Sequence, residues 1–193
     1  MTMALRLFHK ADDRLPDDAL MQKVCRADDD RAFAELYRRH ARRLMGFFFR
    51  QTDADEDLAS DLLQDAFMHV WTARRKFVGT GFRTWLFTIS YNLLRSHYRQ
   101  AEYRRLYEQQ TALTLPTHTE ADIDENLDRK AFDTALRQHL QALPPEARLL
   151  FSLRFEEELT VPQIAEVTGL PEGTVKSRLH TLTQTLRQKL IPS

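Results

Sequence analysis

The sequence predicts an all-α protein of two helical domains joined by a flexible acidic linker. Good helix formers dominate the chain, namely Leu, Ala, Arg, Gln and Glu. Apolar residues recur at the three- and four-residue spacing of a helix rather than in alternation. Only five glycines occur in 193 residues, a length that suits one large domain or two small ones.

Four helical patterns make up the first domain, residues 1–106. Apolar spacing predicts helices over residues 17–26, 30–50, 57–74 and 82–106. The polar or glycine-containing joints ADDD, QTDADED and KFVGTGF separate them. We therefore expect a four-helix bundle.

The last helix of this domain carries two lines of side chains. An ordinary core stripe recurs at helical spacing, formed by Phe82, Leu86, Ile89 and Leu93. Beside it, cations alternate with aromatic rings in a second line, formed by Arg83, Phe87, Tyr91, Arg95 and Tyr98. A packed interior seldom accommodates arginines threaded between rings, so the second line indicates contact with a partner. We expect Trp85, between the two lines, to be at least half buried.

Residues 107–126 lack sustained periodicity, are rich in Thr and acidic residues, and contain Pro116. We interpret them as the linker. A helical pattern resumes in the second domain, residues 127–193. There Pro144 and Pro145 start a new helix, because proline is tolerated in a first turn.

The segment LTVPQIAEVTGLPEGTVKSRLHTLTQTLRQKL, residues 159–190, predicts two short helices joined by a tight turn. Thr160 and Gln163 have capping-box spacing, and Gly169 stands where a helix end needs a left-handed residue. The second helix has an apolar stripe of Val175, Leu179, Leu182, Leu186 and Leu190. Its other side carries groups that can bond base edges and phosphates in a major groove: Lys176, Ser177, Arg178, His180, Thr181 and Gln184. We favour a DNA-binding helix-turn-helix over a plain helical hairpin.

The formal net charge is zero, but charges segregate along the chain. Residues 31–51 and 71–105 are strongly basic, whereas residues 52–70 and 106–128 are acidic. These blocks suggest separate surfaces for different partners, although a solvated helix face would explain any one of them.

The composition excludes several classes of protein. One cysteine, Cys25, cannot build a disulfide framework or a cysteine-based metal site. No apolar run approaches the length of a membrane span, so we expect no membrane insertion. The first residues, MTMALRLFHKADDR, lack the apolar stretch of a signal peptide. We therefore expect a cytoplasmic protein without a metal or cofactor.

Three segments resemble parts of bacterial sigma factors of the sigma-70 family. VPQIAEVTGLPEGTVKSRLH is similar to sigma region 4. DLLQDAFMHVW, residues 61–71, resembles region 2.2, and FRTWLFTISYNLLRSHYR, residues 82–99, resembles regions 2.3 and 2.4. No full region 3 lies between them, a layout similar to the extracytoplasmic-function (ECF) subgroup. The resemblance implies a region 2 bundle and a region 4 helix-turn-helix bundle.

By this resemblance, the protein binds core RNA polymerase, directs it to promoters and initiates strand opening. The −35 element would be bound as duplex DNA by Lys176, Ser177, Arg178, His180 and Thr181. The −10 element would meet the loop 76–82, which shapes a pocket for a flipped base, and the helix after it. There rings stack on unpaired bases and cations follow the backbone, and the implied residues are Lys76, Arg83, Phe87, Tyr91, Asn92, Arg95 and Tyr98.

The resemblance also implies protein partners. Asp61, Gln64 and Asp65 would dock on the clamp helices of the polymerase β′ subunit, and the second domain on the β flap. The acidic linker would pass through the enzyme, where it could mimic nucleic acid. An anti-sigma factor is a further expected partner. The family often has Arg near Thr181 and Thr183, so this recognition helix is expected to make fewer phosphate contacts.

Two alternatives remain open. A one-component helix-turn-helix regulator would carry an N-terminal sensing or dimerising domain, but it leaves the basic and aromatic helix unexplained. A metal-binding helical enzyme is suggested by Asp61, Asp65 and His69 on one helix face, with His40 as the only obvious further ligand. The sequence shows no nucleophile–base pair and no glycine-rich phosphate loop, so we expect no enzyme.

Overall fold

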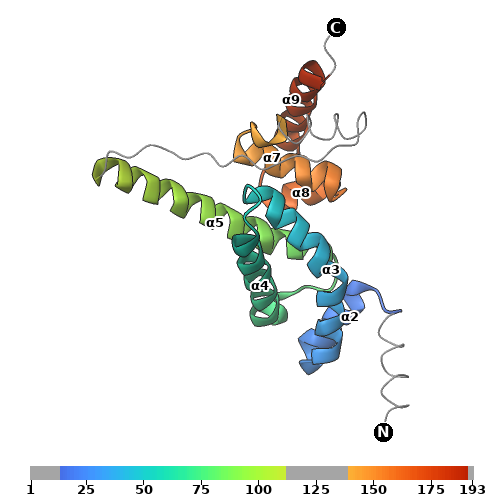
Figure 1. The fold of residues 1–193 in the computed structure, drawn as a ribbon. Helices are drawn as coiled ribbons and strands as arrows, with labels where there is room; N and C mark the ends of the chain where they lie inside the picture. Colours follow the sequence, from blue (N-terminus) through green and yellow to red (C-terminus); the bar gives the residue numbers. More distant parts are fainter. Residues whose placement is uncertain (1–13, 112–138, 191–193) are drawn as a thin grey trace, which may run out of the picture.

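The computed structural model describes residues 14–111 and 139–190, which contain helices and no strand. The helices are α2 (Asp17–Ala27), α3 (Asp30–Gln51), α4 (Glu56–Ala73), α5 (Phe82–Thr111), α7 (Pro145–Phe151), α8 (Val161–Thr168) and α9 (Glu172–Leu190). A 3₁₀ turn, η1 (Arg74–Lys76), follows α4, and a π-helical segment, η2 (Ser152–Glu156), follows α7. The predicted all-α class with two helical bundles is confirmed (Figure 1).

The N-terminal bundle contains the four helices that apolar spacing predicts. Asp29 caps α3, because its carboxylate accepts the N–H groups of Arg31 and Ala32. Asp55 caps α4 in the same way through Leu58. The bundle closes over a buried core rich in large side chains: Leu20, Met21, Leu36, Leu44, Phe47, Phe48, Phe82, Leu86 and Leu94.

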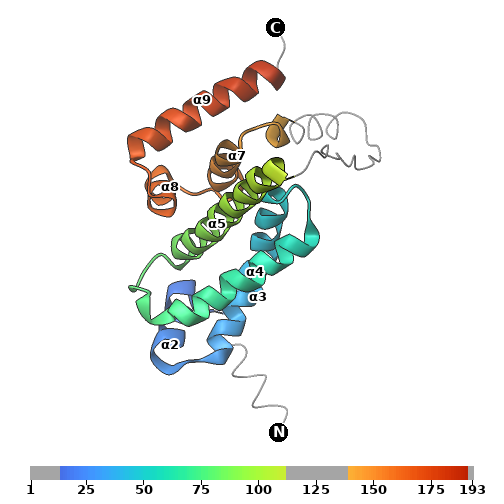
Figure 2. The ribbon, with the colours of Figure 1, turned by 90° about the vertical axis from the view of Figure 1, so that its left-hand side faces the viewer.

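Helix α5 joins the two halves of the molecule. It packs on α4 and α2 along one side and on α8 along another (Figure 2). It runs to Thr111 rather than ending at residue 106, and its far end projects beyond the N-terminal bundle (Figure 1). Good helix formers such as Glu108 and Gln109 continue the backbone pattern without apolar periodicity.

The C-terminal bundle consists of α7, α8 and α9. Pro144 precedes α7 and Pro145 occupies its first turn, as predicted. The core gathers from all three helices and their joints: Leu149, Leu150, Leu153, Leu159, Ile164, Val167, Val175, Leu179, Leu182 and Leu186. The predicted linker beyond residue 111 and most of the helix expected near residues 127–142 lie outside the described residues.

Crossing a bilayer takes a long, strongly apolar helix, and residues 14–111 and 139–190 contain none that qualifies.

Candidate nucleic-acid interface

The predicted helix-turn-helix is confirmed in α8 and α9. A reciprocal capping box starts α8, because the Thr160 N–H donates to Gln163 Oε1 at 2.9 Å and the Gln163 N–H donates to Thr160 Oγ1 at 3.4 Å. Gly169 ends α8 with a left-handed φ of 71°, a conformation that glycine adopts at little cost. This turn fixes the direction in which α9 leaves.

Helix α9 divides into a buried and an exposed face. The buried side chains are Val175, Leu179, Leu182 and Leu186. All of the polar residues expected on the other face are exposed: Lys176, Ser177, Arg178, His180, Thr181 and Gln184. The structure therefore brings the predicted −35 residues together on one accessible helix face. Their contact with DNA stays a prediction.

Many polar groups on α9 already have a local partner. Four hydroxyls donate at 3.0–3.1 Å to backbone carbonyls three or four residues earlier, those of Ser177, Thr181, Thr183 and Thr185. Arg178 Nη1 lies 3.2 Å from Glu146, and Lys176 Nζ lies 3.9 Å from Glu172. Both pairs are exposed, so a DNA phosphate could displace the two glutamates at a small cost in free energy.

The line of rings and cations on α5 is only partly a surface. Phe87 is 2% exposed and meets Phe47 edge-on, with ring centroids 5.2 Å apart. In this conformation Phe87 is a core side chain and cannot stack on a base, contrary to the role that we expected for it. The cause is that α5 packs against neighbours on more than one side, so its buried face is wider than a single stripe.

The other residues of the α5 line, and their neighbours Asn92 and Trp85, are either partly buried or exposed. Tyr98 is partly buried, its hydroxyl donates to the Gln51 carbonyl at 2.6 Å, and burial raises its pKa to about 12. Tyr91 is also partly buried, whereas Asn92 and Arg95 are exposed. Trp85 is more than half buried, as predicted, and packs beside Phe77 with centroids 5.4 Å apart.

The predicted core stripe of α5 is also shifted. Phe82 and Leu86 are buried, but Ile89 and Leu93 are only partly so. Leu94 and Ser90 complete the buried face instead, and Ser90 satisfies its hydroxyl on the Leu86 carbonyl at 2.8 Å.

The loop before α5 is held by α2, which the sequence did not reveal. The Asp18 carboxylate accepts the N–H groups of Gly81 at 3.1 Å and Phe82 at 2.7 Å, so it caps α5 from a distant part of the chain. Gln22 Nε2 donates to the Gly79 carbonyl at 3.2 Å. The sequence held one indirect indication that a distant residue caps α5: Gly81, at the capping position, has no side chain with which to do so.

The loop itself is open to a ligand. Gly79 and Gly81 have φ values of 68° and 80°, which favour glycine. Between them and η1, Val78 is 88% exposed, and Lys76 is exposed as well. The loop is therefore exposed at its beginning and held by α2 at its end, next to α5.

Helix α2 in turn is fixed to α3 by charge. Glu35 is 6% exposed and accepts hydrogen bonds from Arg38 at 2.6 and 2.7 Å and from Arg39 at 2.6 Å. The hydrogen bonds from Arg38, helped by Arg39, lower its pKa to about 2. Asp17 bonds His40 Nε2 at 2.7 Å and Arg39 at 2.8 Å, and the bond to His40 lowers the Asp17 pKa. The two Asp17 contacts hold the helix that carries Asp18, and Glu35 orients Arg39 for one of them.

The expected polymerase-docking residues share one face of α4. Asp61, Gln64 and Asp65 are exposed, opposite the buried Leu62 and Phe67. His69 continues the same exposed face, but His40 bonds Asp17 instead of meeting it. Within the described ranges, no group of three or more His, Cys, Asp or Glu is placed to hold a metal ion.

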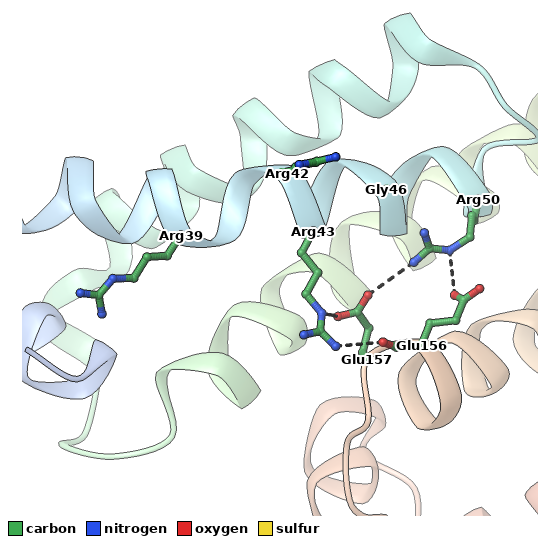
Figure 3. Close-up of a pocket in the computed structure, with 7 residues that line it drawn as sticks. All are labelled: Arg39, Arg42, Arg43, Gly46, Arg50, Glu156 and Glu157. Atoms are coloured by element: carbon green, nitrogen blue, oxygen red, sulfur yellow. Dashed lines mark hydrogen bonds and ion pairs between the residues drawn. The ribbon is translucent and has the colours of Figure 1, made fainter. Parts of the chain in front are cut away.

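A charged joint links the two bundles, which sequence reasoning missed. Arg43 and Arg50 of α3 reach toward Glu156 and Glu157 at the end of η2, beside a pocket of about 490 Å³ (Figure 3). Arg39 and Arg42 also line this pocket but point away from the two acids (Figure 3). Within the joint, Gln51 Nε2 donates to Ser152 Oγ at 2.9 Å, and Arg148 pairs with Asp53.

Family models match both bundles. The model described as Sigma-70 region 2 matches residues 36–104, and the model described as Sigma-70, region 4 matches residues 133–181. The first covers α4 and most of α3 and α5, and the second covers α7, α8 and the first half of α9.

Similar proteins carry the same description over most of the chain. The ECF RNA polymerase sigma factor SigL of Mycobacterium tuberculosis is 31% identical, over 80% of this chain and 86% of its own. The ECF RNA polymerase sigma factor RpoE of Cereibacter sphaeroides is 30% identical, over 92% of this chain and 97% of its own. The ECF RNA polymerase sigma-E factor of Haemophilus influenzae is 29% identical over 93% and 98%.

Two solved structures share the fold. The sigma factor RpoE of Bartonella quintana, in complex with the anti-sigma factor NepR, superposes with a TM-score of 0.64 at 23% identity, covering 82% of this chain and 96% of that one. CnrH, in complex with the cytosolic domain of CnrY, superposes with a TM-score of 0.63 at 24% identity, covering 88% of this chain and 94% of that one. With both region models matched in order and relatives aligned along most of their length, the chain belongs to the extracytoplasmic-function subgroup of the sigma-70 family, the sigma factors that direct RNA polymerase to promoters.

Proposed function

We propose that this sigma factor divides promoter recognition between its two bundles. The exposed face of α9 reads the −35 element as duplex DNA through Lys176, Ser177, Arg178, His180 and Thr181. The loop 76–82 and the start of α5 receive the −10 element as its strands separate. The observation that carries this division is that the chain presents two unlike surfaces: a capped, polar recognition helix, and an open loop that leads into partly exposed rings.

The −10 surface is narrower than the sequence indicated. Tyr91, Asn92, Arg95 and Lys76 lie where unpaired bases and phosphates can reach them, since each is exposed or only partly buried. Tyr98 is anchored to α3, and Phe87 supports the surface from the core. Arg83 belongs to the surface only when the joint between the bundles opens, because its guanidinium contacts Glu157 in the present conformation.

The acidic face of α4 is the surface that we assign to core polymerase. Asp61, Gln64 and Asp65 are exposed and free of any cation on α4, so the β′ clamp helices can approach them. By the same family likeness, the C-terminal bundle docks on the β flap of the polymerase. Residues 107–126 form the linker between the domains 1–106 and 127–193. An anti-sigma protein binds the free chain. The solved relative bound to NepR supports this last partner. The chain acts beside polymerase in the cytoplasm and catalyses no reaction of its own.

Transcription in vitro with core polymerase and a library of promoter sequences tests the function. A gel shift at moderate salt, with and without core, separates the alternatives. The free protein should bind duplex promoter DNA weakly, because its net charge is zero and the two cations at the start of α9, Lys176 and Arg178, lie beside acids. Core polymerase should confer specific binding, with core alone as the control. Tight, sequence-specific binding by the free chain would favour a one-component regulator.

A further inference from the structure

Glu157 is the centre of the joint between the bundles. Its side chain is 1% exposed, although it carries a carboxylate. Arg43 Nε lies 2.5 Å from Oε2, Arg50 Nη2 lies 3.4 Å from Oε1, and Arg83 Nη2 lies 3.7 Å from Oε2. Three cations from the N-terminal bundle therefore converge on one acid of the C-terminal bundle. A carboxylate buried so completely needs such partners.

Neighbouring contacts extend the joint. The Glu156 carboxylate accepts from Arg50 Nε at 2.7 Å, and its carbonyl accepts from Arg43 Nη2 at 2.9 Å. The Arg83 guanidinium also donates to the Glu157 carbonyl. The three arginine side chains are 34–44% exposed, so water and salt reach them while the acid stays covered.

The joint occupies part of the −10 surface. Arg83 is the first cation of the α5 line, and α8 packs on the same helix (Figure 2). Burial and the nearby Arg43 lower the pKa of Arg83, because its guanidinium is partly desolvated there and lies close to a like charge. In this arrangement Glu157 presents one carboxylate oxygen and its backbone carbonyl to Arg83, a cation that would otherwise meet the DNA backbone.

The joint also carries signs of a contact built to separate. Two buried polar atoms in the described part of the chain have no hydrogen-bond partner, Gln51 Oε1 and Arg148 Nε, and both belong to residues of this joint. Unpaired buried polar atoms lower the stability of the closed contact. Next to Glu157, the π-helical η2 ends and Glu158 adopts a left-handed φ of 55°, a local strain that opening could release.

We propose that Glu156 and Glu157 form an intramolecular latch, which holds the free protein closed and keeps Arg83 from DNA by standing in for a phosphate. The inference rests on the proposed −10 role of α5. Opening the latch frees Arg83 and lets α9 move away from α5, so that the two promoter elements can be bound at once. A polyanion therefore competes directly with the two glutamates for the same arginines.

Distances between the bundles test the latch without polymerase or promoter. Cys25 is replaced by Ser, and spin labels are attached through Ser60→Cys on α4 and Gln188→Cys on α9, both at exposed positions. In the parent the distances should form one short population. In Glu156→Gln/Glu157→Gln, a longer population should appear. Glu166→Gln, at an exposed acid on α8, is the matched control and should keep the parent distribution.

Affinity for a thymine-rich single-stranded oligonucleotide gives the second readout. The double Gln variant should bind at least about tenfold more tightly than the parent and the Glu166→Gln control, since one charge-assisted contact no longer has to be broken. Raising NaCl from about 0.1 M to about 1 M should lengthen the parent distances, a measurement that needs no Gln substitution.

The latch would be overturned if the parent protein showed the longer distances between the bundles already at low salt. It would also be overturned if Glu156→Gln/Glu157→Gln left both the distances and the affinity for the oligonucleotide unchanged. Transcription with core polymerase reports separately on the proposed function. A chain that opens as described but never supports transcription would refute the promoter role and would leave only the contact between the bundles, without its effect on promoter DNA. A protein that supports transcription, but whose bundles are far apart at both low and high salt, would refute the latch and leave the promoter role intact.

Discussion

Replacing Phe87 by Leu separates a core ring from a DNA-binding ring. Phe87 is 2% exposed and lies edge-on to Phe47 at 5.2 Å, so the substitution loses an aromatic contact worth about 0.5–1.5 kcal/mol and leaves a small packing defect. We expect the free energy of unfolding to fall by about 1–2 kcal/mol. For a domain of this size the melting temperature should drop by about 4–8 °C for each kcal/mol.

The matched control is Phe49→Leu, the same substitution at a ring that is 38% exposed on α3. It should change stability by no more than about 0.5 kcal/mol. Urea unfolding followed by circular dichroism measures both variants.

Promoter opening gives the complementary readout. Tyr91→Ala and Asn92→Ala alter groups that a base can reach, so they should slow opening about five- to a hundredfold, the cost of about 1–3 kcal/mol for one base contact. Closed-complex affinity should stay nearly unchanged, and Phe87→Leu should open promoters at close to the normal rate at a temperature where it is folded. Permanganate footprinting of unpaired thymines measures the rates. A Phe87→Leu variant of normal stability that opened promoters slowly would refute the assignment of Phe87 to the core.

Three further predictions concern α4, α9 and the buried Glu35 of α3. Reversing charge with Asp61→Lys/Asp65→Lys should abolish pull-down by core polymerase while leaving the circular dichroism spectrum intact, because both carboxylates are exposed on one face of α4; retained binding would place the polymerase interface elsewhere. Lys176→Ala/Ser177→Ala should weaken initial promoter binding and alter −35 preference, whereas a pre-melted −10 bubble should not restore that preference; unchanged selection from a promoter library would remove α9 from −35 recognition. The pKa of Glu35 is lowered from 4.5 to about 2, so the stability it contributes is complete above about pH 4.5 and is lost as the pH falls toward 2. Urea unfolding at stepped pH should show that Glu35→Gln has a flatter dependence over this range, and parallel curves for the two proteins would contradict the origin assigned to it.

Local signals made the helix-turn-helix predictable. The capping box of Thr160 and Gln163 and the left-handed Gly169 act within a few residues, so their meaning does not depend on the rest of the fold. The helix starts at Asp30 and Phe82 were recovered for a similar reason, since apolar periodicity begins there. Family likeness then supplied the functional roles that periodicity alone could not.

Long-range contacts were beyond the sequence. Asp18 caps α5 through residues that lie 63 and 64 positions later in the chain, and the sequence around Asp18 does not indicate this role. The run FEEELT reads as solvated acids, yet its middle glutamate is the most deeply buried carboxylate of the joint, because three arginines from the other bundle surround it. Phe87 was misjudged because one helical line cannot show how many neighbours a helix has.

The threonine row of α9 has a consequence for the kind of base edge that this helix can read. A hydroxyl whose proton is committed to a backbone carbonyl turns outward only its oxygen lone pairs and, for threonine, a methyl group. Such a surface is chemically matched to the amino groups of adenine and cytosine and to the thymine methyl, and it has nothing to donate to the acceptor edge of guanine. In the proposed −35 role, guanines would therefore depend on donors other than these hydroxyls, namely Lys176 and Arg178 at the beginning of the helix and His180 and Gln184 further along the same exposed face.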